Sequence, residues 1–484
     1  MGGNTILLDD SPRVDLKRAG TERAPGSSTA LTGHRKGAIP PPTSGVHSER
    51  RRAAMAEAIL EILRKALIDP DAVDVVLGGP SRGGAAPTDR SPRTRLVIHG
   101  PDALARLLLP PTGDSFAEAY LRGDIDIDGD VMTALLAAQA LDPRRLAPSD
   151  VRRLIRWTLA LRDGAMTATP LGRVSRMSGR RHSKARDMAA IRFHYDVGEA
   201  FYSLWLDARM AYSCAYFPDG TTAADAADLL DVAQDGKLDL IARKLRLGPT
   251  TRLLDIGSGW GSFINFAAER YGSSATGVTL SQRQADESNR RASHAGVGPR
   301  ATAEVRDYRD LAELGAFDAV ASVGMFEHVG RANLPTYFRA AFDSLAPGGL
   351  FLNHGIAASG PPAGLDRRLR PGAAHFLQRY VFPDGELVTV EEAVAVARRT
   401  GFEVLDVQSL RPHYALTLAA WVARLEAHWD QAVASAGEEV ARTWRLYMSA
   451  ARLGFERGEL DVCQLLLAKP AGSRPAGTPL RPWW

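Results

Sequence analysis

The fold is decided by the stretch LLDIGSGWG, which runs from Leu253 to Gly261. An apolar run that ends in an acidic residue and continues into three alternating glycines predicts a parallel strand followed by a tight turn. A helix is expected to begin at this turn, over 262–270. Glycine has no Cβ atom, so the backbone of the turn can adopt positive φ and a ligand can lie against it. The helix N-terminus offers unpaired N–H groups to an electronegative part of that ligand.

The next predicted strand distinguishes between two classes of ligand. A nicotinamide dinucleotide site has the spacing G-x-G-x-x-G and an acidic residue at the end of its second strand. Here the spacing is G-x-G-x-G, and the strand ATGVTL, from Ala275 to Leu280, is followed by Ser281 and a helix rather than by an acid. A nicotinamide fingerprint therefore fails on both counts. The pattern D-x-G-x-G-x-G resembles motif I of the class I methyltransferases that use S-adenosylmethionine (SAM).

Strands and helices alternate along the second half of the chain. Strands are expected at 252–256, 275–279, 301–305, 317–323, 349–354 and 403–408, with helices between them. This alternation with short loops predicts an α/β fold, with a doubly wound, Rossmann-like and mostly parallel sheet. Ligands of such sheets bind at the carboxyl ends of the strands. The loops that follow the strands are therefore the expected site.

Composition bounds the class of protein. The chain has 484 residues, of which 45% are hydrophobic and 24% charged, as in ordinary globular proteins of more than one domain. Its two cysteines, Cys214 and Cys463, lie far apart in the sequence, which excludes a disulfide framework and a thiolate zinc site. No metal site is expected. Because the sequence contains neither an apolar run long enough to cross a membrane nor a signal-peptide core, we expect a cytoplasmic protein.

The formal net charge of +4 hides a strongly basic segment. Residues 151–192 contain eleven Lys or Arg and two Asp or Glu. Such a segment is a candidate for docking on an anionic surface, either phospholipid headgroups or nucleic acid. The alternative is a solvated linker that is basic by chance. Because no known nucleic-acid module is present, we expect no nucleic-acid partner.

By composition and periodicity the chain divides into five segments. The N-terminal part lacks hydrophobic periodicity, and an amphipathic helix, a strand and a Pro-led helix follow it. We predict a disordered tail at 1–52, a small α+β N-terminal module at 53–142, a basic linker at 143–190, a SAM-dependent methyltransferase domain at 191–470 and a flexible tail at 471–484.

A series of motifs follows in the second half of the chain. They are HYDVG from His194, YSCAYF from Tyr212, Asp255 to Gly261, Thr279 to Ser281 with Gln284, MFEHVG from Met325, His354 with Ile356, YVFP from Tyr380, and His413 with Tyr414. In this order they resemble the motifs of the cyclopropane-fatty-acyl-phospholipid synthase family, which includes the mycolic acid cyclopropane synthases. The resemblance covers about 190–470. The module at 53–142 also resembles the N-terminal domain of the bacterial members that act on phospholipids.

The resemblance implies a SAM-dependent enzyme that adds a methylene carbon to the cis double bond of an unsaturated phospholipid acyl chain, forming a cyclopropane fatty acid. Methyl transfer to an alkene leaves a carbocation, and in this family a bound bicarbonate is the base that deprotonates it. A cluster of N–H, O–H and imidazole donors suits this small anion. Carried over by position, the catalytic residues that would hold it are Cys214, Glu327, His354, Ile356 and Tyr414.

The resemblance also assigns the cofactor site. Asp255 is expected to hold the glycine loop rather than touch the ligand, and Asp307 or its neighbours are expected near the adenine. The residues assigned to SAM are Tyr212, Ser213, Asp255, Gly257, Gly259, Gly261, Thr279, Gln284 and Asp307. Without the resemblance, Cys214 would be interpreted as a small buried hydrophobic residue and His354 as a core histidine.

Two departures from the family pattern leave the product open. Ring-forming members often read His-Thr-Ile where this chain has His354-Gly355-Ile356, and the Phe-Pro motif continues here with Asp384 and Gly385. The alternative product is a methylene-branched fatty acid, which a partner reductase converts to a methyl branch. A methyltransferase for a soluble small molecule is a further alternative. We expect the protein to associate peripherally with an anionic membrane surface, and the sequence leaves open whether it forms a homodimer.

Overall fold

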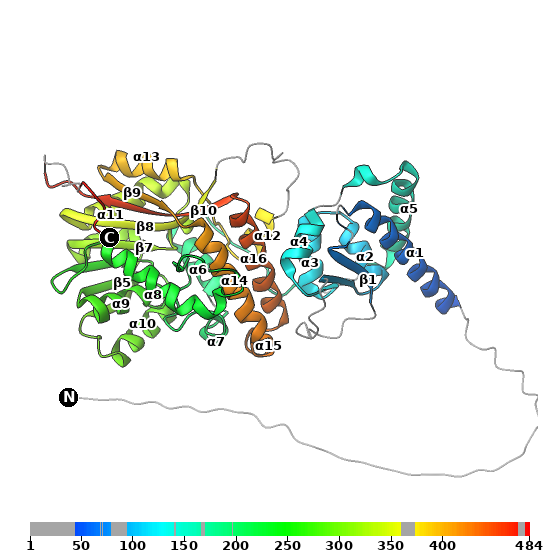
Figure 1. Cartoon of the computed structure of the whole chain (residues 1–484), viewed down its shortest axis with the longest axis horizontal. Coiled ribbons are helices and arrows are strands. Elements are labelled where there is room, and N and C mark those ends of the chain that lie inside the picture. The colour runs from blue at the N-terminus through cyan, green and yellow to red at the C-terminus, as the bar shows by residue number, and fades with distance from the viewer. Residues whose placement is uncertain are drawn as a thin grey trace, which may run out of the picture. The chain divides into compact units, whose positions relative to one another are not determined.

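The computed structural model describes residues 44–67, 69, 71–78, 94–139, 142–165, 170–195, 197–359, 373–472 and 480–484 (Figure 1). Residues 1–43 of the predicted disordered tail lie outside this range, as do residues 473–479 of the predicted flexible tail. Helix α1 spans Ser44–Ala66 and begins before the helix that periodicity predicted at 53. No helix in the described part of the chain is long and apolar enough to cross a membrane.

The larger part of the chain is built on a seven-stranded sheet in the order β6-β5-β4-β7-β8-β10-β9 (Figure 1). The five strands from β6 to β8 pair in parallel, whereas β10 is antiparallel to both β8 and β9. All six strands that the alternation predicts are present, which confirms the α/β class. The strands are β4 (Arg252–Ile256), β5 (Ser274–Thr279), β6 (Ala301–Val305), β7 (Phe317–Val323), β8 (Leu345–Ala358), β9 (Glu403–Ser409) and β10 (Leu460–Ala468).

Helices cover both faces of this sheet (Figure 1). They are α6 (Lys184–Tyr195), α7 (Glu199–Tyr202), α8 (Ala226–Lys244), α9 (Ser262–Tyr271), α10 (Gln282–His294), α11 (Leu334–Asp343), α12 (Ala373–Tyr380), α13 (Val390–Thr400), α14 (Arg411–Ala427), α15 (Trp429–Ala436) and α16 (Glu438–Glu456). Short 3-10 turns lie at Pro143–Arg145 (η1), Tyr308–Leu314 (η2), Phe326–His328 (η3) and Arg331–Asn333 (η4).

The alternation of side chains along β8 separates two cores. Phe351 packs in the cluster that includes α11 and α13, whereas Leu352 packs in the cluster that includes α8 and α9. The same alternation continues toward the strand end. Asn353 accepts a hydrogen bond from Tyr337 of α11 (2.6 Å), so His354 and Ile356 face the opposite side. These two residues therefore share one face at the carboxyl end of the strand.

The N-terminal module is a three-stranded sheet with helices, in the order β1-β2-β3. Periodicity predicts its second strand and the helix that begins at Pro101, and the structure contains both. The predictions did not include β1. The elements are β1 (Val73–Leu77), α2 (Pro101–Leu108), β2 (Thr94–Ile98), α3 (Gly113–Arg122), β3 (Ile125–Asp128), α4 (Val131–Gln139) and, after the module, α5 (Pro148–Ala165).

Helix α16 joins this module to the larger sheet. The buried guanidinium of Arg442 donates to the carbonyls of Tyr120 and Ile125 and pairs with Asp126. The buried guanidinium of Arg445 donates to the Ile127 carbonyl at 3.2 Å. The backbone carbonyls of the module thus accept hydrogen bonds from both buried guanidiniums. An apolar side chain at either position would leave these carbonyls without a donor.

The start of α6 is attached to the rest of the larger domain by its basic side chains. Arg186 forms a bidentate pair with Asp384, and Lys184 pairs with Asp310 at 2.6 Å. At the other end of the chain, Trp483 donates from its indole to the Arg243 carbonyl at 3.1 Å. These contacts connect both chain segments that flank the domain to its surface.

Candidate active site

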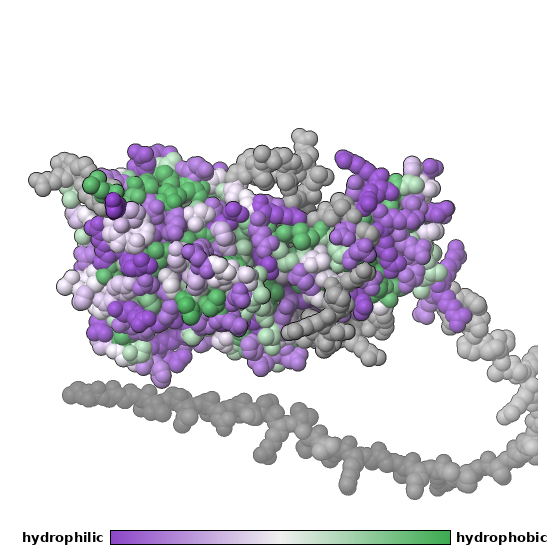
Figure 2. Space-filling view, viewed as in Figure 1, coloured by the Kyte–Doolittle hydropathy of each residue, from purple (hydrophilic) through white to green (hydrophobic). Residues whose placement is uncertain are grey.

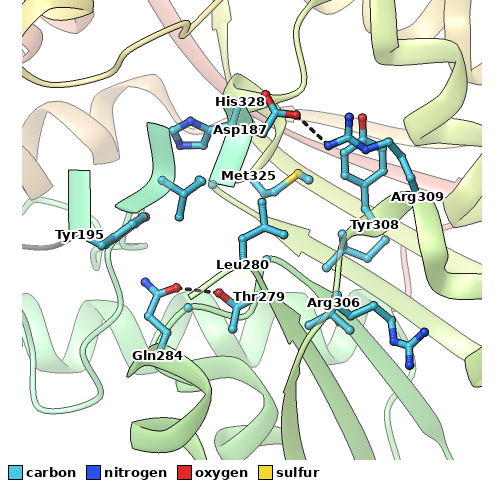
Figure 3. A pocket seen from close by; sticks show the side chains of 16 residues that line it. Asp187, Tyr195, Thr279, Leu280, Gln284, Arg306, Tyr308, Arg309, Met325 and His328 are labelled. Atoms are coloured by element: carbon cyan, nitrogen blue, oxygen red, sulfur yellow. Dashed lines mark hydrogen bonds and ion pairs between the residues drawn. The ribbon is translucent and has the colours of Figure 1, made fainter. Parts of the chain in front are cut away.

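An open pocket lies at the carboxyl ends of β4, β5 and β7 (Figure 3). This is the edge of a parallel sheet at which ligands bind. The glycine loop, the end of β5 and the start of α10 form one wall, and α6 forms another. The lining residues are Asp187, Ile191, Tyr195, Ile256, Gly257, Gly259, Val278, Thr279, Leu280, Gln284, Arg306, Tyr308, Arg309, Gly324, Met325 and His328.

The three glycines of the loop have positive φ and different surroundings. A Cβ atom at Gly257 would lie 2.7 Å from Met325, and one at Gly261 would collide with Ser288 of α10. A Cβ atom at Gly259 would meet no atom within 4 Å, although Gly259 lines the pocket. Gly257 and Gly261 therefore permit close packing. Gly259 leaves space in the pocket itself.

Thr279 and Gln284 present a polar edge to the pocket (Figure 3). The Thr279 hydroxyl donates to Oε1 of Gln284 at 2.7 Å. Nε2 of Gln284 is buried and has no hydrogen-bond partner among the described residues. A buried amide donor without a partner is costly unless a ligand accepts from it. The pair is therefore suited to a ligand with hydroxyl or carboxylate oxygens.

Tyr212, Ser213 and Asp255 lie behind the loop rather than in the pocket lining. A Cβ atom at Gly324, which does line the pocket, would lie 3.7 Å from Ser213. The amine of Lys237, fully buried in α8, donates to the Ser213 hydroxyl at 2.9 Å. Burial raises the pKa of Asp255 to about 7, and the charge of Lys237 opposes this rise. The sequence analysis did not identify Lys237, because nothing local in the sequence marks a lysine as buried.

Asp307 does not line the pocket, but its partner does. Both oxygens of Asp307 accept from Arg309, at 2.7 and 2.8 Å. Arg309 also pairs with Asp187 at 2.8 Å (Figure 3), and both of these residues line the pocket. The acid predicted near the adenine thus positions a guanidinium at the pocket edge. Sequence reasoning missed Arg309.

Glu327 lies on η3, at the end of β7. Its Oε1 atom accepts a hydrogen bond from the backbone N–H of Ile356 at 2.6 Å, which connects two of the predicted catalytic residues directly. Its Oε2 atom is buried and has no partner among the described residues. Burial raises the pKa of Glu327 to about 7, against the effect of the Ile356 hydrogen bond.

His354 is the second buried polar group at this edge. Its Nδ1 atom lies 3.3 Å from Nε2 of Gln464 on β10, and its own Nε2 has no partner within the described chain. Burial lowers the pKa of His354 to about 3, and the charges of Lys237 and Lys244 contribute. The imidazole is therefore neutral at physiological pH. If Gln464 donates to Nδ1, the ring proton is on Nε2.

Cys214 and Tyr414 meet at the carbonyl of Leu410. The Cys214 thiol lies 3.8 Å from this oxygen, and the backbone N–H of Tyr414 donates to it at 3.1 Å. Leu410 itself donates to the Val462 carbonyl, and Val462 pairs with Ile356. Burial raises the pKa of the Cys214 thiol well above its ordinary value, so it stays protonated and is a poor nucleophile.

Buried aromatic rings pack on one another beside Glu327, and we call this cluster the aromatic chamber. Ring centroids lie 4.4 Å apart between His194 and Phe382 and 5.3 Å apart between Phe382 and Tyr447. Burial raises the pKa values of Tyr195, Tyr414 and Tyr447, and the nearby Glu327 carboxylate adds to this rise. The chamber consists of His194, Tyr195, Tyr202, Tyr212, Phe382, Tyr414, Trp421, Trp444 and Tyr447.

The sequence identified only part of this chamber. Tyr212 of the YSCAYF motif and Phe382 of the YVFP motif both belong to the chamber. Tyr216 of the first motif instead packs on His413, with ring centroids 4.6 Å apart. Trp444 and Tyr447 were missed. They lie on α16, far along the chain, and only the tertiary structure brings them to the chamber.

Known proteins share this arrangement of sequence and fold. The family model for mycolic acid cyclopropane synthetase matches residues 182–465. A probable fatty acid methyltransferase of Pseudomonas putida is 38% identical over 385 residues, which cover 78% of this chain and 88% of that protein. The cyclopropane-fatty-acyl-phospholipid synthase of Escherichia coli K12 is 34% identical over 287 residues, covering 59% of this chain and 69% of that protein. The crystal structure of the mycolic acid cyclopropane synthase CmaA1 with SAH and CTAB has a TM-score of 0.54 and 33% identity, and covers 58% of this chain and 98% of that one.

Proposed function

Because the chain belongs to the mycolic acid cyclopropane synthetase family, as its motifs predict, we propose that it adds one carbon from SAM to the cis double bond of an unsaturated phospholipid acyl chain and forms a cyclopropane fatty acid. Enzymes of this family are SAM-dependent methyltransferases that act on lipid acyl chains. The observation that carries the finer proposal is the position of Glu327, whose Oε2 is buried beside the aromatic cluster and has no partner among the described residues.

The open pocket fits SAM. Its glycine loop has free space at Gly259, and Gln284 offers an unpartnered donor beside Thr279. We assign SAM to these residues and to Gly257, with Tyr212 and Ser213 behind the loop. SAM supplies an electrophilic methyl group when it is bound. A mycolic acid cyclopropane synthase of similar fold has been crystallised with SAH, which supports the assignment.

The chamber fits the chemistry of an alkene. A carbon–carbon double bond needs no base before it reacts, but positive charge then develops on the acyl chain. The faces of Tyr212, Phe382 and Tyr447 attract a cation, and more strongly where water is excluded. His354 is neutral here, so it adds no positive charge against that cation. The chamber's residues therefore stabilise charge and exclude water rather than attack the substrate.

A proton must then leave the acyl chain, and we propose bicarbonate as the base that accepts it. Two buried atoms without partners fit an anion that is both donor and acceptor. Nε2–H of His354 is able to donate to a bicarbonate oxygen, and Oε2 of Glu327 is able to accept from its hydroxyl. Cys214, Ile356 and Tyr414 would border the same anion.

The phospholipid substrate lies in a membrane, and we propose that the protein works from the membrane surface. Double bonds lie roughly 10 Å or more below the headgroups of a bilayer whose hydrocarbon core is about 30 Å thick. The acyl chain must therefore leave the bilayer to reach the chamber. The printed name of the Escherichia coli relative, a fatty-acyl-phospholipid synthase, supports a phospholipid substrate.

A second product is favoured by one specific observation. Gly355 stands between His354 and Ile356, and a Cβ atom there would lie 2.8 Å from Phe326. A threonine, which is common at this position in ring-forming members, does not fit against Phe326 without movement. The alternative is a methylene branch, later reduced by a partner reductase. The name of the Pseudomonas putida relative, a probable fatty acid methyltransferase, is compatible with this product.

Lipid mass spectrometry tests the proposal. Vesicles of a monounsaturated phospholipid are incubated with the protein and with SAM labelled in its methyl group. The expected result is a labelled mass gain of one CH₂ unit in the acyl chain, with ring protons in the NMR spectrum. Vinylidene protons would indicate the methylene branch instead. Acyl chains without label would overturn both products, and label in a soluble acceptor would indicate a small-molecule methyltransferase.

A further inference from the structure

The outward face of α5 combines apolar and basic side chains. Toward the module, α5 buries Thr158 and Leu161, and Leu154 and Trp157 are partly buried. On its other side Ile155 is 56% exposed and Leu159 is 49% exposed. These two large apolar side chains lie four residues apart, which places them one above the other on a helix. Exposed aliphatic side chains of this size, adjacent on one helix, indicate a contact surface more than a solvated one.

Four arginines surround this apolar pair. All four side chains are exposed, and none forms an ion pair with any residue that the structure describes. Figure 2 shows mostly hydrophilic surface at the end of the module that carries α5, with hydrophobic patches between the charged side chains. We define the α5 face as Arg152, Arg153, Ile155, Arg156, Leu159 and Arg162.

Part of the basic segment contrasts with this face. The sequence alone treats all arginines and lysines between 151 and 192 as equivalent candidates for docking. In the structure Arg181 and Arg186 pair with Asp384, and Lys184 pairs with Asp310. A charge that is already neutralised contributes little to attraction by an anionic surface. The arginines of α5 are therefore better candidates than these three residues, and among the described residues of the segment they alone surround an exposed apolar pair on one helix.

We propose that the α5 face is the surface by which this protein docks on a bilayer of anionic phospholipid. The inference rests on the proposed function, because it assumes a substrate in a membrane. Arginine guanidiniums bind phosphate groups, while Ile155 and Leu159 enter the boundary between headgroups and acyl chains. Nucleic acid would use the charges but leave the apolar pair in water. A two-fold contact between two copies would bring the arginines of both copies together.

Vesicle sedimentation tests the docking surface in the full chain. The charge variant is Arg152→Gln/Arg153→Gln/Arg156→Gln/Arg162→Gln, and the apolar variant is Ile155→Ser/Leu159→Ser. Each arginine near an anionic surface changes binding by about fivefold at low salt. We expect at least a tenfold loss of binding to phosphatidylglycerol vesicles for the charge variant, and a smaller loss for the apolar variant. Binding of the wild type should fall as salt rises.

Matched controls alter equally exposed residues elsewhere. Arg398→Gln/Arg399→Gln removes exposed charge from α13, and Val232→Ser removes an apolar side chain that is 61% exposed. Both controls should bind vesicles like the wild type. Unchanged binding by both α5 variants would overturn the inference, and so would an equal loss on neutral phosphatidylcholine vesicles or a loss confined to duplex DNA.

A second assay separates this inference from the proposed function. Monounsaturated phospholipid is dispersed in detergent micelles, where docking on a bilayer is not required. The α5 variants should label these acyl chains at the wild-type rate, which also shows that they are folded. Wild-type protein that labels neither vesicles nor micelles contradicts the proposed function. Labelling of micelles together with unchanged vesicle binding contradicts only the docking surface.

Discussion

The open pocket and the aromatic chamber lie at the same edge of one sheet and have opposite character. The pocket combines a glycine loop that leaves room at Gly259 with polar side chains such as Gln284 and Arg309. The chamber is buried and aromatic, and burial shifts the pKa values of the groups beside it toward their neutral forms, to about 7 for Glu327 and about 3 for His354. A polar cofactor needs shape and hydrogen bonds. An acyl chain that becomes cationic needs aromatic faces without water.

Gly259→Val should have the largest effect on SAM binding in the pocket. The new side chain would enter pocket space that the described residues leave free, so we expect SAM affinity to fall roughly 1,000-fold, about 4 kcal/mol. Isothermal titration calorimetry measures this directly. Gly315→Val is the control, because Gly315 also has positive φ and open surroundings but does not line the pocket. SAM affinity that survives Gly259→Val would show that the pocket is not the cofactor site.

Glu327 should give the protein a pH-dependent stability that can be assigned to this one residue. Burial raises the pKa of Glu327 from 4.5 to about 7, so the folded state binds this proton more tightly than the unfolded chain does. The resulting stabilisation is complete below pH 4.5 and is lost as the pH rises through 7, by up to ~3 kcal/mol.

Urea denaturation of the wild type and of Glu327→Gln between pH 4.5 and 8 measures this loss. The buried histidines titrate with the opposite sign in both proteins, so the difference between the two unfolding free energies isolates Glu327. As the pH rises from 4.5 to 7, the unfolding free energy of the wild type should fall relative to that of Glu327→Gln. A difference that is independent of pH would mean that Glu327 is not buried as the structure has it.

The contact between Gly355 and Phe326 positions η3 and hence Glu327. Gly355→Thr should lower the free energy of unfolding by about 1–3 kcal/mol, because the new Cβ would lie 2.8 Å from Phe326. Gly248→Thr is a suitable control, since no atom lies within 4 Å of a Cβ atom there. In Phe326→Leu protein the cost of Gly355→Thr should shrink. If threonine lowers the free energy of unfolding equally at Gly355 and at Gly248, the contact with Phe326 does not explain why this chain has glycine at position 355.

Carbonate should matter to the chamber and not to the pocket. In carbonate-free buffer we expect turnover of the wild type to fall roughly 100-fold or more, the effect of losing a general base, while SAM affinity stays unchanged. Added bicarbonate should restore the rate. Full turnover without carbonate would exclude bicarbonate as the base.

The sequence predicted the pocket better than the chamber for a physical reason. The glycine loop and the strand–helix alternation are local patterns, so the loop, six strands and the family were predicted correctly. The strand β10 was missed because its residues form a nearly continuous apolar run, which periodicity does not distinguish from a buried helix. Lys237, Trp444 and Tyr447 reach the site only through tertiary packing. The linker arginines were likewise indistinguishable until their partners were known.

The central claim is that Glu327 serves the chemistry in the chamber and not the binding of SAM in the pocket. Glu327→Gln tests it most directly, because the amide oxygen preserves the hydrogen bond from Ile356 and only the carboxylate is lost. The measurement is turnover on monounsaturated phospholipid vesicles beside the Kd for SAM in the same protein. We predict that turnover falls on the order of 100-fold or more while the Kd changes less than about twofold. Undiminished turnover, or a loss of SAM affinity as large as the loss of turnover, would contradict the account.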